Sequence, residues 1–191
     1  MQIRNLSGTE VPRALWRELA NTMGFGGALP EKLRRKWPCY YDGRTLQVTV
    51  NRRTTRNVTE GEVTCGSYSL GKIWLYPCPK CTDGFLTHVF LYELCMAWLD
   101  AFHWELSFDR QAGALCDDFA DRAYKLLGGK RRRRMKCWAC QIPETVGPRR
   151  LRRFRAYVDM FRSADGAAIE RMMKEASADR KWNIADARAI A

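Results

Sequence analysis

The chain has 191 residues, which is enough for one domain with a substantial core and a small appendage. Hydrophobic residues make up 46% of it and charged residues 28%, a composition typical of a folded protein and not of a disordered one. We find no uninterrupted apolar run of about 18 residues and no apolar segment near the first methionine. We therefore expect no membrane span, no signal peptide and a cytoplasmic location.

The net charge of +12 is concentrated in one part of the chain. Residues 130–155 contain eleven basic residues and one acidic residue, Glu144, so this segment carries +10 and the rest of the chain only +2. A basic segment of this density predicts a polyanionic partner or the acidic surface of another protein.

The first part of the chain predicts one helix followed by short strands. Residues 10–22 have a helical apolar stripe, and Pro12 suits the first turn of a helix. Residues 44–51 alternate apolar and polar side chains, as a half-buried strand does. Two further strands are expected, one near residues 62–65 and one over residues 68–77.

The second part predicts helices. Residues 85–102 are apolar almost all round, which indicates a helix buried in the core. Residues 107–127 follow as an amphipathic helix capped by Ser107. Pro148 begins another helix, with Leu151, Phe154, Val158 and Phe161 on one face, and a last helix carries Ile169, Met172, Met173 and Ala176.

This order of elements predicts an α+β protein in which a small two- or three-stranded sheet packs on helices. We divide it into an α+β domain of residues 1–129 and a basic, cysteine-containing helical region of residues 130–191.

The stretch FLYELCMAWLDAFH, residues 90–103, directly follows the expected strand GKIWLYP, residues 71–77. This order, and the apolar texture of the helix, resemble the minimal zincin scaffold of SprT-like and ImmA-like zinc metallopeptidases. In that family the helix carries His-Glu-x-x-His, whose two histidines bind zinc while the glutamate acts as general base. Here Tyr92 and Met96 stand at the two histidine positions, and only Glu93 matches.

A neutral phenol and a thioether are poor zinc ligands, so the resemblance implies a degenerate metallopeptidase scaffold, a pseudoenzyme, over about residues 10–127. Glu93 is then a weak catalytic candidate, and a partly buried structural carboxyl is the alternative. An active metalloprotease would need substitute ligands around Glu93. The candidates for that set are His88, Cys95 and one of Asp117, Asp118 and Asp121.

Four of the eight cysteines form two C-x-x-C pairs, Cys78/Cys81 and Cys137/Cys140. The 55 residues between the pairs contain the expected helical hairpin, which can return the chain close to where it left. We therefore predict one structural zinc ion with four thiolate ligands, a closed site without a catalytic position. Two unrelated thiol pairs and a redox pair remain as alternatives.

Arginine pairs bidentately with phosphate and stacks on bases, and an aromatic side chain among such charges suits single-stranded nucleic acid. The residues predicted to contact phosphate are Arg131, Arg132, Arg133, Arg134, Lys136, Arg149, Arg150, Arg152, Arg153 and Arg155, with Trp138 as a stacking residue. The leading hypothesis is thus a nonenzymatic nucleic-acid-associated protein. The alternatives are the metalloprotease described above and an accessory or inhibitory protein, of phage or mobile-element type, that docks on an acidic surface.

Overall fold

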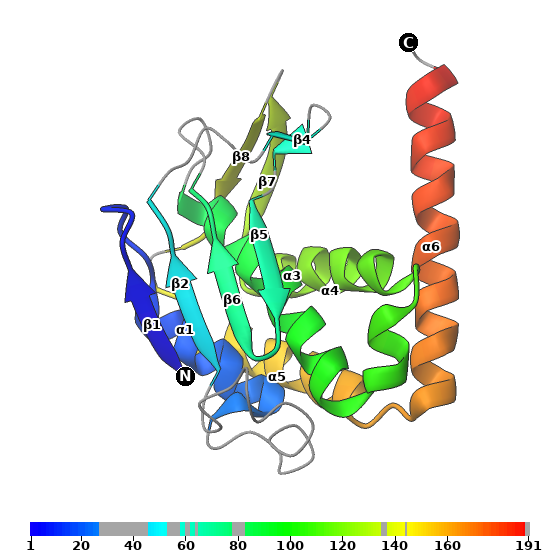
Figure 1. Cartoon of the computed structure of the whole chain (residues 1–191), viewed down its shortest axis with the longest axis horizontal. Coiled ribbons are helices and arrows are strands. Elements are labelled where there is room, and N and C mark those ends of the chain that lie inside the picture. The colour runs from blue at the N-terminus through cyan, green and yellow to red at the C-terminus, as the bar shows by residue number, and fades with distance from the viewer. Residues whose placement is uncertain are drawn as a thin grey trace.

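The computed structural model describes residues 1–26, 46–52, 58–59, 62–63, 65–77, 83–134, 137–143 and 145–189. Its main sheet has four strands, in the spatial order β1 (Gln2–Asn5), β2 (Gln47–Val50), β6 (Lys72–Leu75) and β5 (Gly66–Ser69). The first three of these are parallel, and β5 is an antiparallel edge strand (Figure 1). Two two-stranded ribbons accompany this sheet, β3 (Val58–Thr59) with β4 (Glu62–Val63), and β7 (Lys130–Arg134) with β8 (Cys137–Gln141).

The helices lie on one side of the main sheet (Figure 1). The first, α1 (Arg13–Ala20), continues into the π-helical turn η1 (Asn21–Phe25). After the sheet come α3 (Asp83–Phe102), the 3-10 helix η2 (Trp104–Phe108) and α4 (Ala112–Leu126), followed by α5 (Pro148–Arg162) and α6 (Gly166–Ala189). The predicted α+β class is confirmed, and so is the start of a helix at Pro148.

The main sheet is larger than the two or three strands predicted, because β1 and β5 were both missed as separate strands. The backbone of β1 pairs in parallel with β2, although its four residues have no strong apolar alternation. The expected single strand over residues 68–77 is instead the end of a hairpin, in which β5 turns into β6 at Leu70 and Gly71. Both turn residues have positive φ, 47° and 80°, the geometry of a tight two-residue hairpin turn. A leucine in that conformation is uncommon, so the residue types at this position do not indicate a turn.

One further prediction was wrong in its local structure. Ser107 does not cap α4, because it lies within η2, where its hydroxyl donates to the carbonyl oxygen of Trp104 at 2.7 Å. The backbone leading into α4 is held instead by Asp109, whose carboxylate accepts from the backbone N–H of Gln111 at 2.7 Å. The basic run that begins at Lys130, for which no element of its own was predicted, forms β7, the first strand of the β7–β8 ribbon.

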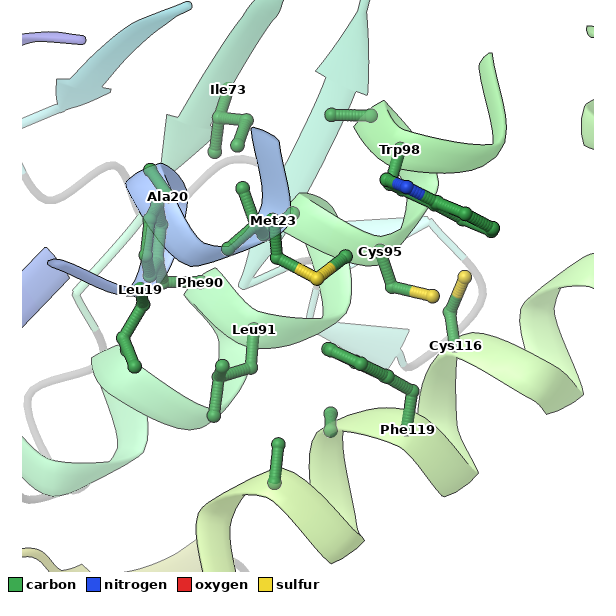
Figure 2. Packing of buried hydrophobic residues seen from close by; sticks show 14 of the residues in the cluster. Leu19, Ala20, Met23, Ile73, Phe90, Leu91, Cys95, Trp98, Cys116 and Phe119 are labelled. Carbon is green, nitrogen blue, oxygen red and sulfur yellow. The ribbon is translucent and has the colours of Figure 1, made fainter. Parts of the chain in front are cut away.

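The core lies between the sheet and α3. Val48, Val50, Ile73 and Leu75 alternate onto the buried face of β2 and β6. Trp16 of α1 stacks on Phe90 of α3 with ring centroids 4.7 Å apart, and its indole N–H donates to Thr87 Oγ1 at 3.0 Å. Figure 2 shows how α1, α3 and α4 contribute side chains to this cluster.

Helix α3 is the centre of this core. The segment Gly84–Phe102 is long and apolar enough to cross a membrane by length and composition, although no membrane span was expected, but 78% of it is buried inside the fold. This burial identifies α3 as the core helix of a globular fold, as predicted. The same core includes Phe154, Val158 and Phe161 of α5 together with Ile169 and Met173 of α6.

Candidate functional site

Glu93 lies where the edge strand β5 passes over α3. A Cβ atom at Gly66 would lie 2.5 Å from Val89 Cγ1 and 2.7 Å from Glu93 Oε1, so the glycine permits a strand-to-helix contact that a larger residue would obstruct. Glu93 is only 5% exposed, and this burial raises the pKa of its carboxyl from 4.5 to about 8. The carboxyl is therefore mostly protonated at neutral pH, and it exchanges its proton at a slightly higher pH, near 8.

Tyr92 and Met96, which stand at the histidine positions of a zincin helix, lie against different parts of the fold. A Cβ atom at Gly113 would lie 3.3 Å from the hydroxyl of Tyr92, so this phenol reaches the start of α4. Met96 lines a pocket beneath the β5–β6 turn instead. Both side chains are half-buried and pack against the core.

Of the substitute ligands considered for an active metalloprotease, His88 and Asp121 contact each other, whereas Cys95 lies against Cys116. His88 Nε2 lies 2.7 Å from Asp121 Oδ1, a contact that joins α3 to α4. Cys95 is buried, and its thiol faces that of Cys116 (Figure 2). Burial, followed by the hydrogen bond between these two thiols, raises the pKa of Cys116 well above its ordinary value. Asp118 pairs with Arg122 at 2.8 Å.

Over the described parts of the chain, no group of three or more histidine, cysteine, aspartate and glutamate side chains is arranged to hold a metal ion. The proposed gathering of His88, Cys95 and an acidic residue of α4 is therefore not formed there.

The predicted zinc site is divided between described and undescribed residues. Cys78 and Cys81 lie outside the described residues. Cys137 and Cys140 both fall within β8, where the ladder pairs them with Arg134 and Arg131 of β7. The backbone between these two cysteines is thus an extended strand, and β8 as a whole lies beside α3. The four-cysteine zinc site stays a prediction.

The predicted phosphate-binding residues occupy two elements. Arg131, Arg132, Arg133 and Arg134 form β7, Trp138 of β8 pairs with Arg133 in the ladder, and Lys136 lies outside the described residues. The other five, Arg149, Arg150, Arg152, Arg153 and Arg155, lie on α5 and are all exposed. Phe154, Val158 and Phe161 occupy the buried face of that helix, so α5 has the predicted amphipathic form.

A contact between Arg150 and Gly128 places the start of α5 beside the end of α4, two residues before β7 begins. A Cβ atom at Gly128 would lie 2.5 Å from Cζ of Arg150, so the guanidinium group sits directly against this residue at the C-terminal end of α4. The positive charge is favourable there because the carbonyl groups at a helix C-terminus carry partial negative charge. Gly128 has a φ of 87° and precedes Lys130, the first residue of β7, by two positions.

Arg150, in the first turn of α5, therefore lies against a residue two positions before β7, although 21 residues separate Gly128 from Arg150 in the sequence. We call the exposed basic residues at this meeting point the basic junction; its members are Lys130, Arg149, Arg150, Arg152 and Arg153. Lys130 was counted in the basic segment but was not among the predicted contact residues; it is included because it is exposed and lies two residues after Gly128.

Arg155 and Arg162 have a second role in the fold. The guanidinium group of Arg155 forms an ion pair with Glu18 of α1, and Arg162 donates to the carbonyl oxygen of Thr22 at 3.1 Å. Both contacts fasten α5 to the first helix and its π-helical turn. Arg155 was predicted to contact phosphate, but in the fold its guanidinium group already has an acidic partner, Glu18.

No protein-family model matches this chain, and no match was found among the curated proteins or the solved structures.

Proposed function

We propose that the protein is a nonenzymatic nucleic-acid-binding protein whose phosphate contacts are made by the basic junction and the adjoining β7–β8 ribbon. The observation that carries this proposal is the packing of Arg150 against Gly128, which places the start of the arginine-rich helix α5 beside the residue two positions before the arginine-rich strand β7. A polyanion binds such a concentration of charge with release of its counterions, whereas two separate basic segments would each bind weakly.

The outward face of α5 suits this role. Arg149, Arg152 and Arg153 project from a helix whose opposite face is anchored in the core, so their positions are fixed by packing. Arginine forms bidentate contacts with phosphate, and contacts to phosphate do not distinguish one base from another. The proposal is therefore binding with little sequence preference, with Trp138 as a stacking residue for unpaired bases.

The scaffold is proposed to be a degenerate zincin of the SprT-like or ImmA-like kind, inherited by a phage or mobile-element protein with loss of the metal ligands. Its support is the antiparallel edge strand β5 that passes over α3, with Glu93 against Gly66 at the contact. With Tyr92 and Met96 at the metal positions, Glu93 has no zinc-bound water to activate, so no peptidase activity is proposed.

A structural zinc ion held by Cys78, Cys81, Cys137 and Cys140 is proposed as a separate component. Two features support it: the thiolate donor set suits tetrahedral zinc, and the helical hairpin of α3 and α4 returns the chain so that β8 lies beside α3. When bound, such an ion stabilises the fold and offers no open position for catalysis.

The test of nucleic-acid binding is a salt titration. Fluorescence anisotropy with labelled single-stranded and duplex DNA and RNA would be measured for the wild type and for an Arg149→Gln/Arg152→Gln/Arg153→Gln variant. Loss of three phosphate contacts should weaken binding roughly tenfold or more, because hydrogen bonds to charged groups are strong. It should also make the slope of log K against log salt shallower by about 2 to 3.

The matched control removes the same number of charges elsewhere. Arg4, Arg110 and Arg171 are exposed and lie on β1, on the turn before α4 and on α6. An Arg4→Gln/Arg110→Gln/Arg171→Gln variant should lose far less affinity, because only diffuse charge is removed. Equal loss in both variants would show that net charge alone governs binding, and the basic junction would then have no special role.

The rival function is docking on an acidic protein surface. It predicts no measurable binding of any nucleic acid at about 0.15 M salt, where a protein that makes roughly 6–10 phosphate contacts still binds. That result would refute the proposed function.

A further inference from the structure

A second candidate binding site is a pocket whose charge differs from that of the basic junction. It is a pocket of about 180 Å³ between the β5–β6 turn, the end of α3 and η2. Tyr68 lies on the strand side, Met96 and Asp100 come from α3, and Trp104 and Phe108 come from η2. None of the described residues that line the pocket is basic, although the chain as a whole carries +12.

The polar part of the pocket is firmly positioned. Asp100 is only 7% exposed, and its Oδ2 accepts from the hydroxyl of Tyr68 at 2.5 Å. The same hydroxyl accepts from the backbone N–H of Gly71 at 2.9 Å, so the β5–β6 turn, the phenol and the carboxyl form one chain of hydrogen bonds. The carboxyl group of Asp100 is thereby held at one place in the wall of the pocket.

The aromatic part is open to solvent. The rings of Trp104 and Phe108 stand nearly perpendicular, at 86°, with centroids 4.3 Å apart, and Phe108 is 68% exposed. An exposed phenylalanine at the rim of a pocket that also holds a buried acid has no evident role in the core. Aromatic faces carry partial negative charge and attract cations, most strongly where water is partly excluded.

We infer that this pocket binds an organic cation, an alkylammonium group such as the head of a lysine or methylated lysine side chain. Its volume is below the roughly 300–1,000 Å³ of pockets for drug-sized ligands, so a small group fits it better than a large molecule. An anion is disfavoured by Asp100. A hard metal ion is disfavoured because calcium and magnesium need several oxygen ligands, and here aromatic rings and a thioether surround one carboxyl.

The inference is independent of the proposed nucleic-acid binding, since phosphate and ammonium would occupy different surfaces. It would give the protein one acidic, aromatic site for a cationic group and one basic site for a polyanion.

The test compares choline with its uncharged carbon isostere, dimethylbutanol, by calorimetry and by the NMR shift of the Trp104 indole N–H. A cation site should bind choline roughly 5- to 30-fold more tightly than the isostere, whereas a merely apolar pocket binds the two alike. A peptide with one lysine, and the same peptide with trimethyl-lysine, would compete with choline and show whether a protein side chain or a free small molecule is preferred.

Two variants address the wall, each with a matched control. Asp100→Asn keeps an oxygen acceptor for Tyr68 and should weaken choline binding about 5- to 30-fold, while Asp109→Asn, an exposed carboxylate outside the pocket, should leave it unchanged. Phe108→Leu keeps apolar bulk at an exposed position and should also weaken binding, while Phe102→Leu should not.

Tighter binding of choline than of dimethylbutanol, lost in the two pocket variants only, supports the inference. Equal binding of choline and its isostere overturns it, and so does the absence of any binding at about 10 mM of each cation, which is weaker than the least affinity expected of a specific site. If Asp100→Asn fails to fold, Phe108→Leu decides the question, because its side chain is mostly in solvent.

Discussion

Burial of Glu93 makes the stability of the protein depend on pH in a defined direction. The pKa of its carboxyl is about 8 in the folded chain against an ordinary value of 4.5. Between these two values the folded state keeps a proton that the unfolded state releases, so the free energy of unfolding falls as pH rises from about 4.5 to about 8. Below this range the contribution of the neutral carboxyl is fully present.

The size of the effect follows from the two pKa values. One unit of difference corresponds to about 1.4 kcal/mol, so between roughly pH 5 and pH 8 the wild type should lose on the order of 3 kcal/mol, as an upper limit. Glu93→Gln places a neutral group of nearly the same shape against Gly66 and has no proton to lose. This variant should therefore lose much less stability over the same range.

The assay is urea unfolding followed by circular dichroism at intervals from about pH 5 to pH 9. Glu105→Gln serves as the control, because Glu105 is an exposed carboxylate at the start of η2. The informative quantity is the difference between wild type and Glu93→Gln at each pH, which should grow steadily toward pH 8. Parallel curves for these two proteins would refute the claim that Glu93 is buried as a neutral acid against β5.

Other outcomes follow from the contact between β5 and α3 and from the cysteine pairs. Gly66→Ala should destabilise the fold by about 1–3 kcal/mol in urea unfolding, because its Cβ would meet Val89 and Glu93 at 2.5–2.7 Å. Gly113→Ala is the control, because a Cβ atom at this helical position would meet only the Tyr92 hydroxyl, at 3.3 Å. It should change stability by no more than about 1 kcal/mol. An equal loss of stability in both variants would contradict the close approach of β5 to α3. Metal analysis should find one zinc ion per chain in the wild type and none in a Cys78→Ser/Cys137→Ser variant; zinc that persists in the variant would exclude the four-cysteine site and direct attention back to α3.

The helices could largely be predicted because their signals are local. The apolar texture of residues 85–102 predicted a buried helix, and α3 is one. The spacing of Phe154, Val158 and Phe161 predicted a helix with one buried face, and α5 has it. In both cases the apolar periodicity agrees with the burial imposed by the fold, so sequence and tertiary structure give the same answer.

The strands were harder to predict because their partners are distant in sequence. β1 is defined by its backbone pairing with β2, some 45 residues later in the chain, which Gln2–Asn5 alone does not indicate. The turn between β5 and β6 places Leu70 at positive φ, which the fold can stabilise but composition does not predict.

The sequence by itself determined the α+β class, the buried helix, the absence of both zincin histidines and the presence of a strongly basic segment, because each of these depends on residue type or local spacing. Only the tertiary structure decided that Arg150 meets Gly128, that Glu93 lies against Gly66, and that Asp100, Trp104 and Phe108 line one pocket. These are contacts between elements, fixed by how the helices pack on the sheet, and packing depends on side chains that are far apart in the chain. The functional proposals rest on those contacts.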